Sequence, residues 1–595
     1  MTFFKTACIG IAVLVLHTTT YAQEKYNLNF DDFDSENEFM PEGWFKWGNY
    51  ENLNGENLTG EKLDENNYVG KVVSDQKGKF GCITYKIPAH YVGDTIRLSG
   101  RIKYENVKGF VGLLMRVDGS GSNKSLAFES MQKLKIKGTN DWKEYTIMSP
   151  YPVGAESIYV GGILAGKGIA WFDDFKITID GKDIQELKKT PKNYLKDYNA
   201  DKLDTAIRDN SKPINLSLAD SLFTSLDPLI ERLGNKKIVA IGESTHGTSE
   251  FYQMREIITK RLIEEKDFNL FVLESPYDDI ELLNKDLLEK PLDGLIKKHL
   301  LSIYQTKEMK SFLQWYKENY LRNDIKFKGC DDSYWVFYEV LIDNVEDIND
   351  KKLNRLLKEL KSNIDKIAIG NLKKEYKKNT AIYNNILDVE SHLKATNNLN
   401  EKIEEIIFNG KNTYINYANM KNKKQFQSRD EIMAERISFF AKNKSNKIIV
   451  WAHNAHISNQ IIADNEIGVM GRDLKKEFGE AYHSIGFSTL EGSYSFIDEK
   501  FINGDHLYTD ELKKATLETT ENHLWENVLA LNGSAFYLNM TALRKESNLD
   551  AVIGPTKLIG YSKETNMDIY QTPFMNIFDS LVFIKKTSAT TPLDE

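Results

Sequence analysis

Two hydrophobic patterns divide the chain into two parts. From Tyr26 to about Ile179, apolar and polar residues alternate with a period of two, as over residues 96–104 (IRLSGRIKY), and turn residues interrupt the alternation. A period of two places successive side chains on opposite faces of a strand, so this segment predicts a series of half-buried strands. We expect an all-β sandwich over residues 24–182.

After about residue 213 the pattern becomes one of alternating strands and helices. Uniformly apolar runs predict strands that are buried on both faces, and helically spaced apolar residues such as Phe251, Met254 and Leu262 lie between the first two. Alternation of this kind is typical of a mainly parallel sheet with helices on both faces. We expect an α/β domain over residues 213–590, with strands at residues 237–241, 268–273, 325–330, 447–451 and 482–487.

Two further segments connect these parts. Residues 183–212 are charged and have little apolar periodicity, which predicts a linker or one amphipathic helix at the junction. Residues 336–445 are rich in Lys, Glu, Asn and Leu at helical spacing and contain no strong strand. We expect a helical insertion there, which could act as a lid because it lies between two strands of the sheet.

The first 22 residues have the pattern of a secretory signal peptide. Lys5 supplies a positive charge, residues 7–16 form an apolar run too short to span a bilayer, and Ala22 ends a short cleavage site. Cys8 lies inside the apolar run, so a lipid-anchored form is not expected. The sequence therefore predicts a secreted or periplasmic protein without membrane insertion.

Composition narrows the choice of partners. The formal net charge is −9 at pH 7, which disfavours nucleic acid and anionic membranes as partners. Apart from Cys8, the cysteines are Cys82 and Cys330, one in each predicted domain, so we expect no structural disulfide.

Carboxylates and imidazoles follow four of the predicted strands. Because the carboxyl ends of parallel strands meet at one edge of a sheet, where ligands bind, we expect these side chains to form one site. Turn and cap roles would explain single carboxylates, but they explain the histidines poorly. The residues are Glu243 and His246, Glu274, Asp331, and His453 with His456.

These residue types favour hydrolysis by activated water. The motif at residues 242–246 (GESTH) lacks the Gly-x-Ser-x-Gly pattern of a serine nucleophile, although Cys330 beside Asp331 leaves a cysteine nucleophile open. A neutral imidazole can take a proton from water, and a neighbouring carboxylate stabilises the resulting imidazolium. Arg255, about two helical turns after His246, is a candidate for stabilising the oxyanion.

A metal site is an alternative that the spacing leaves open. His453-x-x-His456 and Glu243-x-x-His246 both have ligand-like spacing. The pattern permits a divalent ion without requiring one, so our main expectation is a site with no metal and no other cofactor.

Parts of the chain resemble known families. Residues 138–180, with their WFDD stretch at 171–174, resemble the final strands of jelly-roll carbohydrate-binding-like modules. Sugar stacking on Trp44, Trp47 or Trp142 is one interpretation, and burial of these rings in the core is the commoner one.

The second half resembles the erythromycin esterase family. The resemblance is carried by GESTHG at residues 242–247 with Arg255, the Leu273-Glu274-Ser275 strand end, Gly329-Cys-Asp331, residues 429–435 (RDEIMAE) and residues 451–456 (WAHNAH).

This resemblance implies metal-independent hydrolysis of a carboxylic ester or lactone. It implies His246 as the general base, with Glu243, Arg255, Glu274, His453 and His456 around it. A macrolide or a glycosylated ester is the expected small-molecule substrate. The alternatives are a metal-dependent hydrolase of the same fold and a glycan-binding protein with an inactive esterase-like domain.

Overall fold

The computed structural model describes most of the chain after its first 25 residues. The predicted signal peptide, residues 1–22, lies outside the described residues. Within 26–594 the described part excludes residues 33–39, 49–57, 65–66, 75–79, 120–124, 191–192, 199, 217–218, 321–323, 333–335, 368–374, 420–426, 464–466, 503–504, 518–523, 546–551 and 564–567.

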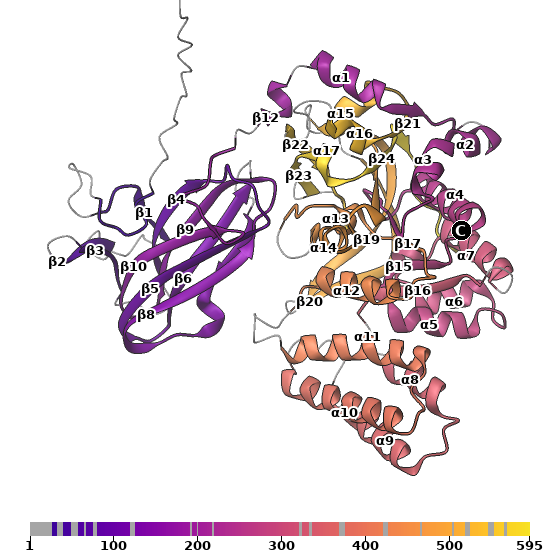
Figure 1. Ribbon diagram of the computed structural model, residues 1–595, viewed down its shortest axis with the longest axis horizontal. Helices are drawn as coiled ribbons and strands as arrows, with labels where there is room; N and C mark the ends of the chain where they lie inside the picture. Colours follow the sequence, from indigo (N-terminus) through magenta and orange to yellow (C-terminus); the bar gives the residue numbers. More distant parts are fainter. Residues whose placement is uncertain are drawn as a thin grey trace, which may run out of the picture.

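The amino-terminal part is a sandwich of two antiparallel sheets (Figure 1). Alternating inward-facing residues of both sheets, among them Ile83, Leu113 and Phe172, form one continuous core. One sheet has the order β1 (Trp44–Gly48), β4 (Phe80–Pro88), β9 (Ala155–Ala165), β6 (Phe110–Gly119), β7 (Ser125–Ser130). The other has the order β2 (Leu58–Asp64), β3 (Asn67–Ser74), β10 (Gly168–Ile179), β5 (Thr95–Val107), β8 (Gly138–Pro150), with β11 (Lys182–Asp183) beside β10.

The carboxyl-terminal part contains an eight-stranded mixed sheet. Its six strands from β24 to β16 are all parallel to their neighbours, and β21 and β13 extend it in antiparallel fashion. The order is β13 (Ser211–Pro213), β21 (Ala535–Leu538), β24 (Ser580–Ile584), β18 (Tyr482–Ser488), β14 (Ile238–Ile241), β17 (Ile448–Trp451), β15 (Leu270–Pro276), β16 (Lys326–Asp331). The predicted sandwich followed by a mainly parallel α/β domain is confirmed.

The apolar strands are buried on both faces because helices cover both sides of the sheet. Ile238 and Ala240 of β14 belong to one core cluster, whereas Val239 and Ile241 belong to the other. The first face is covered by α12 (Arg429–Ala441) and α14 (Val469–Phe478), and the second by α3 (Asp227–Leu233), α4 (Ser249–Lys266), α6 (Leu292–His299) and α7 (Lys307–Asn319).

The predicted insertion between β16 and β17 is helical, and its outer helices project away from the sheet (Figure 1). Side-chain caps define several helix starts: Asp350 accepts from the N–H groups of Lys352 and Leu353, and Ser428 forms a capping box with Glu431. The helices are α8 (Phe337–Val345), α9 (Lys351–Ile364), α10 (Tyr376–Ala395), α11 (Glu401–Ala418) and α12.

The range 183–212, for which we expected a linker or a helix, contains both short strand and helix. β12 (Asn193–Tyr194) pairs with β22 (Val552–Lys557), and α1 (Ala200–Asp209) buries Leu203 and Ile207 in the core of the α/β domain. The remaining elements complete the α/β domain. They are α2 (Ala219–Ser225), α5 (Tyr277–Asp286), α13 (Asn454–Ile457), β19 (Glu491–Ile502), β20 (Asp505–Thr516), α15 (Trp525–Ala530), α16 (Met540–Lys545), β23 (Ile569–Thr572), α17 (Phe574–Ile577) and β25 (Lys586–Thr587).

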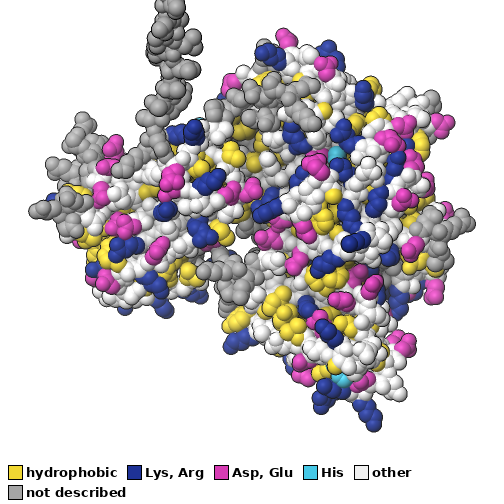
Figure 2. All heavy atoms as spheres, in the orientation of Figure 1, with side chains coloured by type: hydrophobic (Ala, Val, Ile, Leu, Met, Phe, Trp, Pro, Cys, Tyr) yellow, Lys and Arg dark blue, Asp and Glu magenta, His cyan; other side chains and the backbone are white. Residues whose placement is uncertain are grey.

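The two domains touch along a short boundary. The Val153 N–H of the sandwich donates to the Ile461 carbonyl at 3.1 Å. The Tyr194 hydroxyl donates to Glu156 Oε2 at 2.6 Å. On the visible face, basic and acidic side chains are interspersed over both domains (Figure 2). Among the described helices, none has the length and apolar character needed to cross a membrane.

Candidate active site

The loop after β14 places the first pair of site residues. Gly242 and Gly247 flank it at points where other chain segments come very close: a Cβ at Gly242 would lie 2.1 Å from Asn454 Oδ1, and one at Gly247 would lie 2.0 Å from the Ser495 carbonyl oxygen. Between them, His246 Nδ1 lies 2.9 Å from Glu243 Oε1, and both side chains are buried. The loop therefore holds an imidazole and a carboxylate in direct contact.

Arg255 of α4 holds the far side of this carboxylate. Its Nη2 lies 2.7 Å from Glu243 Oε2, and its guanidinium carbon lies 4.6 Å from the ring centroids of both Tyr252 and Trp451. Burial alone would raise the pKa of Glu243, but Arg255 and then His246 outweigh it and lower that pKa. The carboxylate is thus kept ionised beside the imidazole.

Our expectation that Arg255 stabilises an oxyanion does not fit this position. The side chain is 0% exposed and lies behind Glu243, between two aromatic rings. Spacing along α4 placed Arg255 near the site but could not show on which side of the carboxylate it lies. It is a positioning residue that acts through Glu243.

Glu274 connects the ends of β15 and β17. Its Oε2 accepts from the His453 backbone N–H at 2.9 Å, and its Oε1 lies 3.2 Å from His456 Nε2 and 2.9 Å from Arg429 Nη2. Burial would raise the pKa of Glu274, but His456 and Arg429 hold it well below its usual range. The buried carboxylate therefore joins both histidines of the second motif.

His456 lies between two carboxylates. Its Nδ1 is 2.7 Å from Asp430 Oδ1, and its Nε2 faces Glu274. Burial alone would lower the pKa of His456, but Asp430 and Glu274 raise it to about 10. At neutral pH this ring is an imidazolium, with both nitrogens acting as donors.

His453 has the opposite protonation state. Burial and then the neighbouring His246 and His456 lower its pKa to about 3, so the ring is neutral at pH 7. Its Nδ1 accepts from the Ala455 N–H at 3.2 Å, which leaves the proton on Nε2. Within the described part of the chain this buried Nε2 has no hydrogen-bond partner. It is a donor without an acceptor, 4.8 Å ring to ring from His246.

Three site residues were missing from the sequence prediction: Tyr561, Arg429, and Asp430, which contacts His456 Nδ1. Tyr561 stacks on a face of the His246 ring, with ring centroids 4.2 Å apart and an interplanar angle of 11°, whereas Glu243 contacts Nδ1 at the edge of that ring. Arg429, the first residue of α12, binds Asp331 through Nε and Nη2 at 3.0 and 2.6 Å and also reaches Glu274. Arg429 and Asp430 could have been found, because they are the first two residues of the RDEIMAE motif at residues 429–435, whereas no sequence pattern marks Tyr561.

Solvent reaches the cluster from the side of Arg429 and His456. Their side chains are 31% and 13% exposed, whereas those of Glu243, Glu274 and Arg255 are 0% exposed. Tyr561 is half-buried over His246. The deeper residues are thus placed to hold charge, and the outer ones are placed to meet a ligand.

The structure also bears on the other chemistries that the sequence left open. Cys330 is buried in β16, donates Sγ–H to the Leu273 carbonyl at 3.4 Å, and has its pKa raised by burial, so it is unsuited to act as a thiolate nucleophile. Among the described residues, no group of three or more His, Cys, Asp or Glu side chains is arranged to hold a metal ion. Cys82 and Cys330 lie in different domains and are not joined by a disulfide.

The predicted residues therefore meet at one edge of the sheet. Strand ends of β14, β15, β16 and β17 supply Glu243, His246, Glu274, Asp331, His453 and His456, and α4 supplies Arg255. Imidazoles in opposite protonation states beside ionised carboxylates, at the carboxyl edge of a parallel sheet, are characteristic of an enzyme active site.

Comparison with known proteins gives the class of this enzyme. The chain belongs to the erythromycin esterase family, whose profile matches residues 263–587. This membership supports a hydrolase function. The match includes Glu274, Asp331, Arg429, His453 and His456, and it begins after the His246 loop.

Individual relatives are distant in sequence. The chain is similar to the erythromycin esterase type II of Escherichia coli, with 24% identity over 336 residues that cover 50% of this chain and 80% of the relative. A crystal structure of a Bacillus cereus protein superposes with a TM-score of 0.55 and 22% identity, covering 66% of this chain and 99% of that one. TmCBM61 in complex with β-1,4-galactotriose aligns over 26% of this chain and 99% of its own, with 16% identity and a TM-score of 0.19.

Proposed function

We propose that the protein hydrolyses a carboxylic ester or lactone with water activated by His246. The observation that carries the proposal is the buried contact of His246 with Glu243, backed by Arg255 and adjacent to His453. An ionised carboxylate at Nδ1 leaves Nε2 of the imidazole as the base and stabilises the imidazolium after proton transfer.

In this mechanism the water oxygen attacks the acyl carbon while its proton moves to His246 Nε2. The new C–O bond forms as the carbonyl π-pair moves onto oxygen and gives an oxyanion. Collapse of that intermediate breaks the bond to the leaving alkoxide, which takes the proton from the imidazolium. The products are a carboxylic acid and an alcohol, and the base is regenerated.

His453 is the best-placed donor for the oxyanion. Its neutral ring carries a proton on a buried Nε2 that has no acceptor among the described residues, close to the His246 ring. A donor that is fixed before the reaction and shielded from water stabilises developing charge most effectively. Arg429 and the His456 imidazolium add positive charge at the exposed side.

Macrolide lactones and esters of glycosylated compounds are the proposed substrates. The test is hydrolysis of a panel of macrolides, acylated sugars and aryl esters, followed by product analysis. Glu243→Gln keeps the shape of the side chain but removes its charge. We expect this variant to cleave the best substrate about 10² to 10⁴ times more slowly than wild type. A Glu243→Gln enzyme with wild-type turnover would contradict the proposed dyad.

A second proposal assigns a glycan partner to the sandwich. The outer face of the β1–β4–β9–β6–β7 sheet holds a cavity of about 830 Å³ lined by Trp47, Phe110 and Phe128 together with Arg116. The guanidinium carbon of Arg116 lies 5.4 Å from the Trp47 ring centroid. Aromatic faces beside a fixed polar group suit the stacking and hydrogen bonding of a sugar.

The three tryptophans differ in their suitability for this role. Trp44 is 5% exposed, stacks on Phe30 and donates to the Asn27 carbonyl, so it is a core residue. Trp142 belongs to β8 of the other sheet, with Arg101 over its ring. We expect Trp47→Ala to abolish binding on a glycan array and Trp142→Ala to leave it intact. Equal binding by both variants would contradict the proposed cavity.

We also propose that the protein is exported to the periplasm or the medium, on the basis of the signal-peptide pattern of residues 1–22.

A further inference from the structure

The ring of Tyr561 lies over the residue that we propose as the general base. Its centroid is 4.2 Å from that of His246, and the two planes differ by 11°, so the rings are stacked. Glu243 contacts the same imidazole at Nδ1, an atom on the edge of the ring. Tyr561 therefore covers a face of the base and leaves its in-plane nitrogens to hydrogen-bonding partners.

Main-chain hydrogen bonds fix the segment that carries Tyr561. The Ile559 N–H donates to the Ser244 carbonyl at 2.9 Å, which ties the segment to the loop of His246 itself. The Ile497 N–H of β19 donates to the Tyr561 carbonyl, also at 2.9 Å. Ile559 is buried in a small apolar cluster together with residues of β19. The backbone on both sides of the stack is therefore held in place.

The Tyr561 ring is uncharged at neutral pH. Burial and then the carboxylate of Glu274 raise the pKa of Tyr561 well above its usual range. A neutral aromatic ring has negative electrostatic potential at its face and positive potential at its edge. The face that meets His246 is therefore suited to a positive charge.

The charge on His246 changes during the proposed reaction. When the attacking water gives its proton to Nε2, the neutral imidazole becomes an imidazolium. A cation within about 6 Å of the centroid of a tyrosine ring is attracted to its face, and the separation of 4.2 Å is well inside that limit. The attraction develops as the proton arrives, and an interaction that is stronger in the transition state than in the ground state raises kcat.

We propose that Tyr561 is a positioning residue that assists proton transfer, because its ring stabilises the His246 imidazolium by a cation–π interaction. This inference rests on the proposed function and adds a second stabilising group to it. Glu243 acts at the edge of the imidazolium through its charge, and Tyr561 acts at the face. Because Tyr561 is half-buried, it also shields that face from solvent, which strengthens the interaction.

The other groups that act on His246 are unchanged when only residue 561 is substituted. They are Glu243 on the same loop with Arg255 of α4 behind it, Glu274 of β15, His453 after β17, and the Tyr252 hydroxyl, which donates to the His246 carbonyl at 3.3 Å. A series of substitutions at residue 561 therefore isolates the contribution of its ring.

The first test is steady-state kinetics on the best ester substrate. Tyr561→Phe keeps the ring, whereas Tyr561→Leu keeps much of the volume but has no aromatic face. We expect kcat of Tyr561→Leu to be about 3- to 30-fold below that of Tyr561→Phe, with KM differing by less than about twofold. Equal kcat values for these two variants would overturn the inference.

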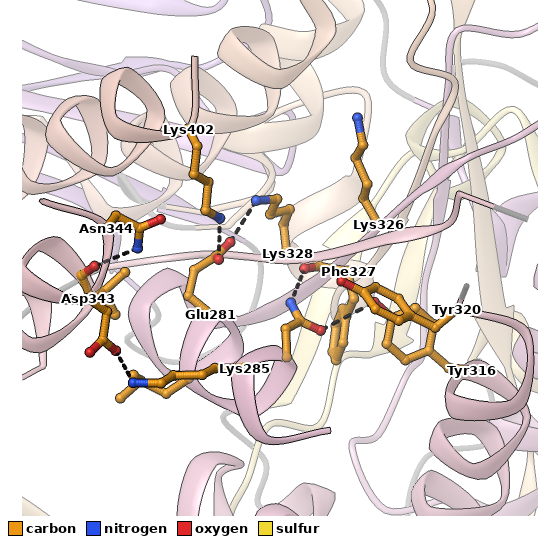
Figure 3. Close-up of a pocket in the computed structure, with 13 residues that line it drawn as sticks. Glu281, Lys285, Tyr316, Tyr320, Lys326, Phe327, Lys328, Asp343, Asn344 and Lys402 are labelled. Carbon is orange, nitrogen blue, oxygen red and sulfur yellow. Dashed lines mark hydrogen bonds and ion pairs between the residues drawn. The ribbon is translucent and has the colours of Figure 1, made fainter. Parts of the chain in front are cut away.

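Tyr320→Leu is the matched control. Tyr320, at the end of α7, is half-buried like Tyr561, but its aromatic neighbour is Tyr316, with ring centroids 5.5 Å apart. It lies beside Lys326 at the amino-terminal end of β16, away from the catalytic edge of the sheet (Figure 3). We expect this variant to have the kcat of wild type.

Fluorinated phenylalanines at residue 561 separate the charge of the ring face from its shape. Each added fluorine atom weakens the negative potential of the face, while the ring keeps nearly the same size. We expect kcat to fall stepwise from phenylalanine through its analogues with one, two and three fluorine atoms. A flat series would overturn the inference, since a ring that only packs against His246 would be insensitive to this change.

An NMR titration keeps this inference separate from the proposed function. Isotope-labelled histidine reports the pH at which the His246 ring takes up its proton, and loss of one signal in His246→Asn identifies it. We expect that pH to be lower in Tyr561→Leu than in Tyr561→Phe, because the imidazolium loses its stabilising face. Circular dichroism confirms that both variants are folded.

If the wild-type protein cleaved no ester, the proposed function would fail, and the titration would still decide this inference. The same protonation pH in both variants would overturn the cation–π interaction, whereas a lower pH in Tyr561→Leu would support it.

Discussion

At the scale of single residues, the site depends on pairs of groups held in opposite protonation states. Glu243 and Glu274 are ionised although they are fully buried, since Arg255, Arg429 and the histidines compensate them. His453 is neutral and His456 is charged, although the two rings are only 6.5 Å apart. Each state follows from its contacts: His456 touches two carboxylates, whereas among the described residues the His453 side chain forms no hydrogen bond or ion pair with a carboxylate.

The raised pKa of His456 makes stability depend on pH in a defined window. The folded-state pKa of His456, about 10, lies above the ordinary value of about 6.5, so the protonated ring stabilises the folded state. This stabilisation is complete below pH 6.5 and is lost as pH rises through 10. We compare the free energy of unfolding of wild type with that of His456→Gln. From pH 6.5 to pH 10 we expect the difference to decrease by at most about 1.4 kcal/mol per pH unit. Urea titrations at several pH values measure it, and parallel pH profiles for the two proteins would contradict it.

Removing the partner of a buried carboxylate is predicted to be costly. In Arg255→Gln the side chain of Glu243 loses its compensating charge, and we expect the protein to lose about 3–5 kcal/mol of stability. An exposed pair provides the control: Arg208→Gln removes an ion pair with Asp204 on α1 and should change stability by about 1 kcal/mol or less. Similar small losses in both variants, measured by chemical denaturation, would show that Arg255 does not compensate Glu243.

At the scale of elements, the carboxyl edge of the sheet was predictable and the loops that cover it were not. The apolar runs that become β14, β15, β16 and β17 are local signals, so the strands and the residues after them follow from the sequence. Tyr561 comes from a loop more than 300 residues after His246 in the chain, and nothing in its local pattern separates it from the other 28 tyrosines. The side of Glu243 on which Arg255 lies depends on how α4 packs against β17, which no local pattern encodes.

The His246 loop is also held by elements that are distant in sequence. The Gly247 carbonyl accepts from the Ser495 N–H of β19 and from the Thr590 N–H near the carboxyl terminus, at 2.8 and 3.0 Å. We expect Gly247→Ala to cost about 1–3 kcal/mol, since its Cβ would collide with the Ser495 carbonyl, and to reduce activity with it. Gly294→Ala in α6, where nothing lies within 4 Å of the new Cβ, should be neutral or stabilising. Thermal melts compare the two, and a tolerated Gly247→Ala would contradict the close packing of this loop.

At the scale of the whole molecule, the fold separates two surfaces: the catalytic edge of the α/β sheet, and the outer face of the sandwich, for which we propose glycan binding. The catalytic domain carries the family match, whereas the sandwich lies outside it. The composition indicated an acidic globular protein, but it gave no indication of where these surfaces lie. Their positions follow from sheet order, which pairs strands far apart in sequence.

The whole enzyme is predicted to work without a dissociable metal. Both nitrogens of His456 face carboxylates, and Nδ1 of His453 is taken by a backbone N–H, so these rings are arranged for proton chemistry. We expect ester hydrolysis to be unchanged after chelation with EDTA and dialysis, with elemental analysis of the sample as the control. Loss of activity on chelation, restored by a divalent metal ion, would favour the metal-dependent alternative.

The central claim is that the imidazole of His246 removes a proton from the attacking water. The direct measurement is kcat/KM of purified His246→Asn on the best ester substrate, beside wild type and His299→Asn, a buried histidine of α6 outside the site. The account predicts a loss of about 10² to 10⁴ in His246→Asn with unchanged circular dichroism, and near-wild-type activity in His299→Asn. A folded His246→Asn enzyme that hydrolyses the ester at the wild-type rate would contradict it.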